Sequence, residues 1–129
     1  MVALAPGWQL EVTRGPEWLF VELTCEHEHE WDNPPLADSI WQLLEQHFTY
    51  RIVLDLSRVQ MLHTWLVGQL VRLNHRVRAH DGVVRVCGLS ERNQDVLRSC
   101  RLDGFFPHYR DRTDALVGAS AVSGPTKPR

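Results

Sequence analysis

The chain has 129 residues, which is enough to bury one hydrophobic core but too few for two domains of ordinary size. Hydrophobic residues make up 43% and charged residues 23% of the sequence, and these values exclude a wholly disordered chain. The formal net charge of -2 provides no overall basic field, so the composition does not favour a nucleic-acid-binding protein.

The chain begins with two short β-rich runs, residues 7–14 and 17–23, on either side of a Gly-Pro turn signal. In the first run Trp8, Leu10 and Val12 alternate with polar residues, and the second run alternates more loosely. The pattern predicts a β-hairpin with one buried face.

The segment 25–35 shows no helical period and ends in a helix-start signal. Asn33 is suited to cap a helix, and Pro34 and Pro35 fit a first turn, where a missing backbone N–H costs little. Apolar residues at helical spacing then predict a helix over residues 36–48.

Two apolar strands frame a second helix. Residues 52–54 form a continuous apolar strand of the kind that is buried on both faces. The following helix has an apolar stripe formed by Leu66, Leu70, Leu73 and Val77. An Asp-Gly turn leads to a strand over residues 83–86, which predicts a right-handed βαβ unit. The loop His63-Thr64 then lies at the carboxyl edge of a strand, where ligands and phosphates bind in α/β proteins.

The last third of the chain continues the alternation. A Ser-Glu pair opens a third helix that ends near residues 102–104, and the apolar segment 105–107 is a short final strand or anchor. One or two helical turns are expected over residues 111–117, followed by a disordered tail over 118–129. We therefore expect a single α/β domain over residues 1–117 with a mixed sheet.

An ordered set of short motifs carries a family resemblance. These motifs are Asp55-Leu56-Ser57, Met61-Leu62-His63-Thr64, Gly68, Leu70, Gly82, Gly88-Leu89-Ser90, Leu97, residues 102–106 and Asp114-Ala115-Leu116. Over roughly residues 8 to 117 the chain resembles the STAS domain, the fold shared by bacterial anti-sigma factor antagonists and the cytoplasmic part of sulphate transporters. The resemblance implies a mixed four- to five-stranded sheet with helices packed mainly on one face.

The resemblance also implies a function. Family members of the antagonist type are non-enzymatic modules without a cofactor, and they bind an anti-sigma factor that is often a serine kinase of the histidine-kinase fold. Phosphorylation of a serine at the start of the central helix abolishes this binding, and that position falls on Thr64. The implied partner-binding residues are Asp55, Ser57, Met61, His63, Thr64, Trp65 and Gly68. We expect a monomer or a weak dimer.

The phosphorylation loop departs from the family pattern. The family loop reads Asp-Ser-Ser-Gly, whereas this chain has His63-Thr64-Trp65-Leu66. Threonine keeps a hydroxyl that can accept a phosphate, but the large indole of Trp65 either obstructs the usual kinase or anchors a partner. If Thr64 is simply the N-cap of its helix, the domain is a constitutive scaffold that does not switch.

A different functional class is suggested by the segment after the hairpin. If it is extended, Cys25, His27 and His29 point to one side, and thiolate and imidazole are good zinc ligands. No second ligand pair accompanies them, so a charged, solvated extension of the sheet edge explains the same residues. A metal or small-ligand sensor is the second alternative to the antagonist.

Signals for catalysis, nucleic acid and membranes are weak. The sequence has no nucleophile elbow, phosphate-binding glycine loop or dinucleotide fingerprint. The basic residues Arg72, His75, Arg76 and Arg78 are expected to form a solvated helix face. No apolar run approaches about 18 residues, no signal peptide is evident, and the three cysteines are widely spaced. We expect a cytoplasmic protein without structural disulfides.

Overall fold

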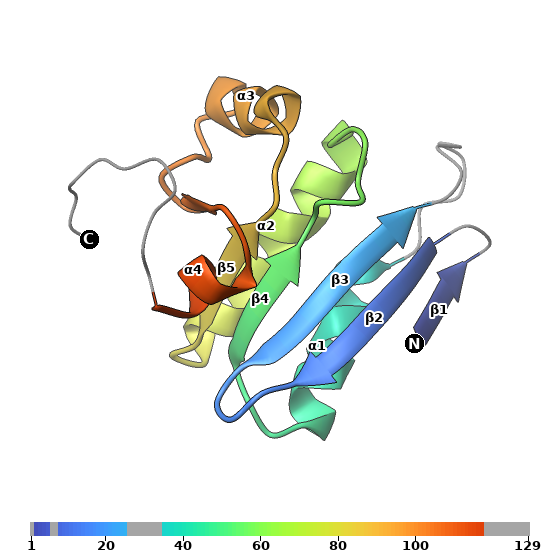
Figure 1. Ribbon diagram of the computed structural model, residues 1–129. Helices are drawn as coiled ribbons and strands as arrows, with labels where there is room; N and C mark the ends of the chain where they lie inside the picture. The colour runs from blue at the N-terminus through green and yellow to red at the C-terminus, as the bar shows by residue number, and fades with distance from the viewer. Residues whose placement is uncertain (1, 6–7, 26–34, 118–129) are drawn as a thin grey trace.

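Strands and helices alternate along the chain after an antiparallel start (Figure 1). The computed structural model describes residues 2–5, 8–25 and 35–117. The strands are β1 (Val2–Ala5), β2 (Trp8–Arg14), β3 (Leu19–Cys25), β4 (Arg51–Asp55), β5 (Val83–Cys87) and β6 (His108–Tyr109). The helices are α1 (Leu36–Gln46), α2 (Thr64–Ala79), α3 (Glu91–Ser99) and α4 (Arg112–Val117).

Within the described residues, the strands form one six-stranded sheet in the order β1-β2-β3-β4-β5-β6. Neighbouring strands from β1 to β3 are antiparallel and those from β3 to β6 are parallel, which confirms the predicted hairpin and mixed sheet. The sheet exceeds the expected four to five strands because β1 and β6 are short edge strands. β6 contains only His108 and Tyr109, so the final strand lies after the predicted segment 105–107, of which Phe106 is a buried anchor. Two residues are too few for an alternating pattern to reveal a strand.

The two faces of the sheet are covered differently. α1 and α2 pack on one face over the larger core, to which Leu19, Val21 and Leu54 contribute (Figure 1). α4 packs on the other face at β4, β5 and β6, where Val53 and Cys87 belong to a smaller apolar cluster. β4 is therefore buried on both faces, as its continuous apolar sequence predicts.

The start of α1 differs from the prediction. Pro35 is the N-cap of the helix rather than part of its first turn, and the predicted cap Asn33 lies outside the described residues. A side chain from α2 satisfies one of the free N–H groups, because the Ala37 N–H donates to Gln69 Oε1 at 2.8 Å. α1 ends at Gln46, two residues before the predicted end.

The other helices begin where the sequence predicts and bury the predicted residues, but α3 ends at Ser99, before the predicted end near residues 102–104. The four stripe residues of α2 are each at most 1% exposed. The Ser90 hydroxyl caps α3 by accepting a hydrogen bond from the Asn93 N–H at 3.2 Å. None of the helices within the described residues has the length and apolar character needed to cross a membrane. The expected disordered tail, residues 118–129, lies outside the described residues.

Candidate protein-interaction site

The loop between β4 and α2 lies at the carboxyl end of β4, which is flanked by the parallel strands β3 and β5 (Figure 1). His63 is the N-cap of α2, with extended backbone angles φ -76° and ψ 160°. The Val67 N–H donates to the His63 carbonyl at 3.0 Å, while the His63 side chain makes no capping hydrogen bond. Thr64 is therefore the first helical residue, and the interpretation of Thr64 as the N-cap is wrong.

Asp55, the last residue of β4, shapes the start of the loop. Its Oδ1 accepts a hydrogen bond from the Ser57 N–H at 3.0 Å, and its Oδ2 lies 3.6 Å from Arg112 Nε on α4. Gly88, directly after β5, has φ 77°, and a β-carbon there would lie 2.8 Å from Asp55 Oδ1. Glycine alone fits both the backbone conformation and the narrow gap, so the neighbouring strand braces this turn.

A buried side chain from α3 holds the rest of the loop. Asn93 is 0% exposed; its Nδ2 donates to the Val59 carbonyl at 3.0 Å, and its Oδ1 accepts from the Leu62 N–H at 2.9 Å. Sequence reasoning missed this residue. The available signal was a polar residue four positions before Leu97, on the apolar face of a predicted helix.

The predicted partner-binding residues surround this loop with different exposures. Ser57, His63, Thr64 and Gly68 are exposed, whereas Asp55, Met61 and Trp65 are partly buried. Thr64 and Gly68 lie four residues apart on α2 and so share one face of the helix. A β-carbon at Gly68 would meet nothing within 4 Å, so the surface beside Thr64 is open.

Trp65 turns partly into the core. Its ring packs edge-on against Trp8 of β2, with ring centroids 5.2 Å apart and an interplanar angle of 73°. Trp8 is 6% exposed and belongs to the larger core. The indole of Trp65 therefore links the start of α2 to the hairpin, and only part of it is available to a partner.

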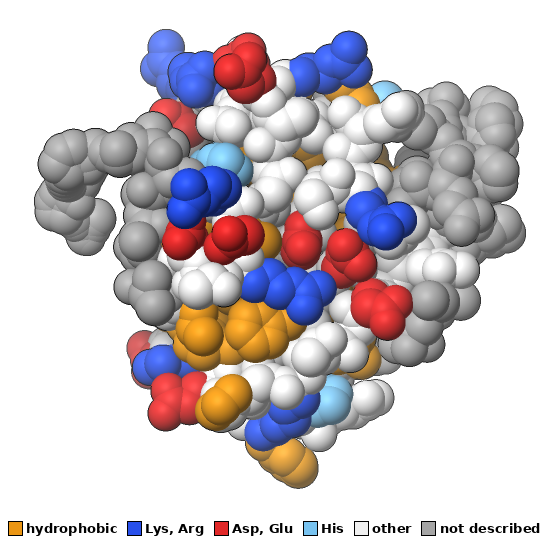
Figure 2. Space-filling model, in the orientation of Figure 1, with side chains coloured by type: hydrophobic (Ala, Val, Ile, Leu, Met, Phe, Trp, Pro, Cys, Tyr) orange, Lys and Arg blue, Asp and Glu red, His pale blue; other side chains and the backbone are white. Residues whose placement is uncertain are grey.

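Charged side chains of both signs gather on the sheet face next to the loop. Glu11, Glu22 and Asp55 occupy matching register positions on β2, β3 and β4. Arg58 Nε lies 3.5 Å from Glu22 Oε2, and Arg112 pairs with Asp55 as described above. Figure 2 shows acidic and basic side chains interspersed across this face, with hydrophobic side chains gathered beside them. The face is thus largely self-compensated in charge.

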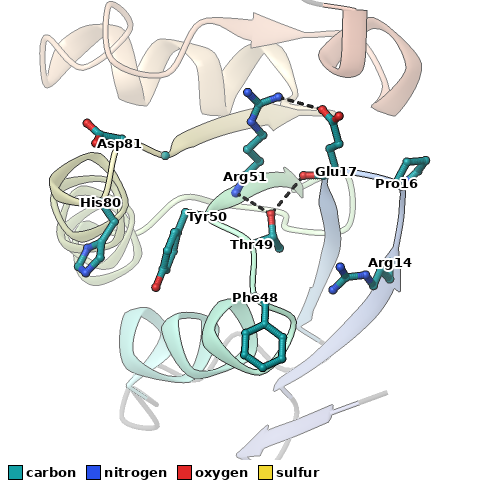
Figure 3. Close-up of a pocket in the computed structure, with 10 residues that line it drawn as sticks. Arg14, Pro16, Glu17, Phe48, Thr49, Tyr50, Arg51, His80 and Asp81 are labelled. Carbon is teal, nitrogen blue, oxygen red and sulfur yellow. Dashed lines mark hydrogen bonds and ion pairs between the residues drawn. The ribbon is translucent and has the colours of Figure 1, made fainter.

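A separate open pocket lies at the opposite end of the sheet. It has a volume of about 520 Å³ and is lined by residues from the hairpin turn, the start of β4 and the end of α2 (Figure 3). Arg51 pairs with Glu17 at 3.3 Å, and Arg14 donates to the carbonyl of His47. The pocket is separated from the loop by the length of β4, from Arg51 to Asp55.

The metal site and the basic helix face that the sequence suggests have different outcomes in the structure. The described part of the chain contains no group of three or more metal-binding side chains. Cys25 ends β3, but the other candidate ligands, His27 and His29, lie outside the described residues. The predicted basic face of α2 is exposed, and its Arg76 pairs with Asp38 of α1 at 2.9 Å.

Comparison with known proteins agrees with this geometry. The family model of the STAS domain matches residues 23–115, which is more than half of the chain. No curated protein gives a significant match.

Several solved structures share the fold. One is an anti-sigma factor antagonist from Mycobacterium paratuberculosis, with a TM-score of 0.73 and 19% identity, covering 92% of this chain and 98% of that one. A variant of RsbS from Moorella thermoacetica has a TM-score of 0.69 and 10% identity, covering 86% and 94%. An anti-sigma-factor antagonist (STAS) domain protein from Planctomyces limnophilus has a TM-score of 0.66 and 18% identity, covering 85% and 97%.

Proposed function

The chain belongs to the STAS domain family, and we propose that it is a cytoplasmic, non-enzymatic anti-sigma factor antagonist that works by partner switching. Its partner is an anti-sigma factor or serine kinase of the histidine-kinase fold. The observation that carries the proposal is the exposed Thr64 at the first position of α2, next to a loop that is held by hydrogen bonds to Asp55 and Asn93. Structural neighbours described as anti-sigma factor antagonists support the same reading.

The fixed loop favours binding because little conformational freedom is lost on association. The Asp55 side chain holds the first turn, and Asn93 holds the segment from Val59 to Leu62. A surface that is already ordered avoids part of the entropic cost of forming an interface. Exposed Ser57 and His63 then present polar groups around a partly buried apolar Met61.

Phosphorylation of Thr64 supplies the switch. A phosphate adds about -1.5 to -2 charges at neutral pH, and it has three strong acceptor oxygens. At the amino end of α2 these charges are compatible with the helix, because the helix dipole and the free N–H groups favour an anion there. The modification therefore leaves the fold intact and opposes binding by placing a hydrated charge in the interface.

One observation favours an alternative to the switch, a constitutive scaffold that binds its partner without regulation. Trp65 follows Thr64 directly in the chain and packs against Trp8, so the residue next to the acceptor is bulky and constrained. A kinase active site that accepts a small residue at this position would be obstructed. In that case the same surface binds its partner permanently.

Affinity capture from the native organism, combined with mass spectrometry of the bait, tests the proposal. We expect the unmodified chain to recover an ATPase of the histidine-kinase fold. We expect that ATPase to be lost when Thr64 carries a phosphate. Recovery of the same partner with Thr64 unmodified under all growth conditions would support the scaffold. Recovery of no such ATPase by either form would contradict the proposed partner class.

A further inference from the structure

A small apolar pocket lies between α2 and the connection from α3 to β6. It has a volume of about 200 Å³, and its apolar walls are Val71, Leu102, Phe105 and Phe106. Phe105 is 51% exposed, so apolar surface at the pocket is open to solvent. Pockets for drug-sized ligands measure about 300 to 1,000 Å³. A ligand that fills this pocket is therefore a small one, with a single ring or a short chain.

One side-chain amide, that of Asn74, also lines this pocket. Asn74 of α2 is only 7% exposed, and its side-chain amide forms no hydrogen bond with any other described residue. Because the amide borders the cavity and is not enclosed by protein, it can bond to solvent or to a molecule bound in the pocket.

The lining of this pocket includes basic side chains but no acidic ones. His75 and Arg78 complete the lining, and no acidic residue is part of it. Within the described residues the Arg78 guanidinium forms no ion pair, whereas Arg76, two residues earlier, pairs with Asp38. Asp103 is exposed in the same connection but does not line the pocket. A free guanidinium beside apolar walls favours an anionic group on an apolar body.

We propose that this pocket binds a small carboxylic acid with an aromatic or short aliphatic body. The apolar body contacts Phe105 and Phe106, the carboxylate pairs with Arg78, and the Asn74 amide donates a hydrogen bond to it. The site is distinct from the loop before α2, since its lining contains none of the loop residues. Its existence is therefore independent of the proposed antagonist function.

Titrations of the isotope-labelled full chain, followed by nuclear magnetic resonance, test this site. The probes are phenylacetate and octanoate, and the neutral comparison is phenylacetamide. Each acid is expected to bind with a dissociation constant of about 1 mM or lower. The resonances of the Asn74 side-chain amide and of the Leu102 and Phe105 backbone are expected to shift.

Two substitutions at exposed arginines separate a specific site from general charge attraction. Arg78→Gln is expected to weaken phenylacetate binding about tenfold and to leave phenylacetamide binding unchanged. Arg72→Gln, on the same helix but outside the lining, is the matched control and is expected to change neither. No resonance shift at Asn74 with either acid at about 10 mM would overturn the proposal. Equal weakening by Arg78→Gln and Arg72→Gln would overturn it as well.

Discussion

Asn93 of α3 donates a hydrogen bond to the carbonyl of Val59 at 3.0 Å, across 34 residues of sequence. Through this contact a helix outside the βαβ unit determines the conformation of the loop before α2. The same side chain accepts a hydrogen bond from the Leu62 N–H, so its amide is both a donor and an acceptor toward the loop.

Replacing this amide is expected to loosen the loop. Asn93→Leu leaves the buried Val59 carbonyl and Leu62 N–H without their partner, which costs about 1 to 3 kcal/mol of unfolding free energy for each buried unsatisfied group. Urea denaturation measures the change. Ser99→Leu, at an exposed position of the same helix, is the matched control, with an expected change within about 0.5 kcal/mol. Equal stability of the two variants would show that the Asn93 contacts do not hold the loop.

Two glycines near the site are expected to respond to alanine in opposite directions. Gly88→Ala forces a side chain into φ 77° and against Asp55 Oδ1, and it is expected to destabilise the protein by about 1 to 3 kcal/mol. Gly68→Ala fills open space on the helix and is expected to stabilise it by about 0.5 to 1 kcal/mol. Thermal and urea unfolding of both variants measure whether each substitution raises or lowers the unfolding free energy. A neutral Gly88→Ala would mean that the turn after β4 is not braced by β5.

The protein is expected to lose stability in mildly acidic solution because of His108. Its Nε2 accepts the Leu89 N–H at 3.2 Å, and burial lowers the pKa of His108 below the ordinary value of 6.5. As the pH falls below 6.5, the unfolded chain takes up a proton at His108 more readily than the folded protein does. The unfolding free energy therefore decreases with falling pH until the folded form also protonates.

The variant His108→Gln isolates this contribution, because glutamine keeps a neutral acceptor but does not titrate. Its unfolding free energy is expected to decrease less than that of the wild type between about pH 7 and pH 5.5. Urea denaturation at several pH values measures both profiles. Parallel profiles would show that His108 does not link folding to pH in this range.

The cysteines are expected to differ in reactivity. Cys87 is buried, and desolvation, with a smaller effect of the Asp55 charge, raises the pKa of its thiol to about 12. Cys100 is exposed at the end of α3. Alkylation followed by peptide mass spectrometry is expected to label Cys100 in the native protein and Cys87 only after unfolding. Labelling of Cys87 at the rate of Cys100 would contradict the packing of the smaller apolar cluster between the sheet and α4.

Local sequence patterns predicted the framework well. The spacing of Leu66, Leu70 and Val77 gave the buried face of α2, and the Ser90 cap marked the start of α3. Alternation beginning at Trp8 and Leu10 gave the buried face of the hairpin. These features depend on neighbours a few residues away, which is why the sequence alone reveals them.

Other features depend on contacts between distant segments. The hydrogen bond from Leu62 to Asn93 spans 31 residues, and the contact of Trp65 with Trp8 joins α2 to the hairpin. Such contacts appear only when the topology places α3 and β2 beside the same loop. For the same reason the sequence could not show that Thr64 follows the N-cap, because cap geometry is a property of the folded backbone.

Binding of Thr64→Glu and Thr64→Gln to the purified captured ATPase, measured by calorimetry, tests the central claim most directly. The two variants have side chains of similar size at an exposed position and differ in charge. We expect Thr64→Gln to bind within a few-fold of the wild type and Thr64→Glu at least about tenfold more weakly, a difference of about 1.4 kcal/mol. Equal binding of the two variants to the same partner would contradict a switch that works through charge at Thr64.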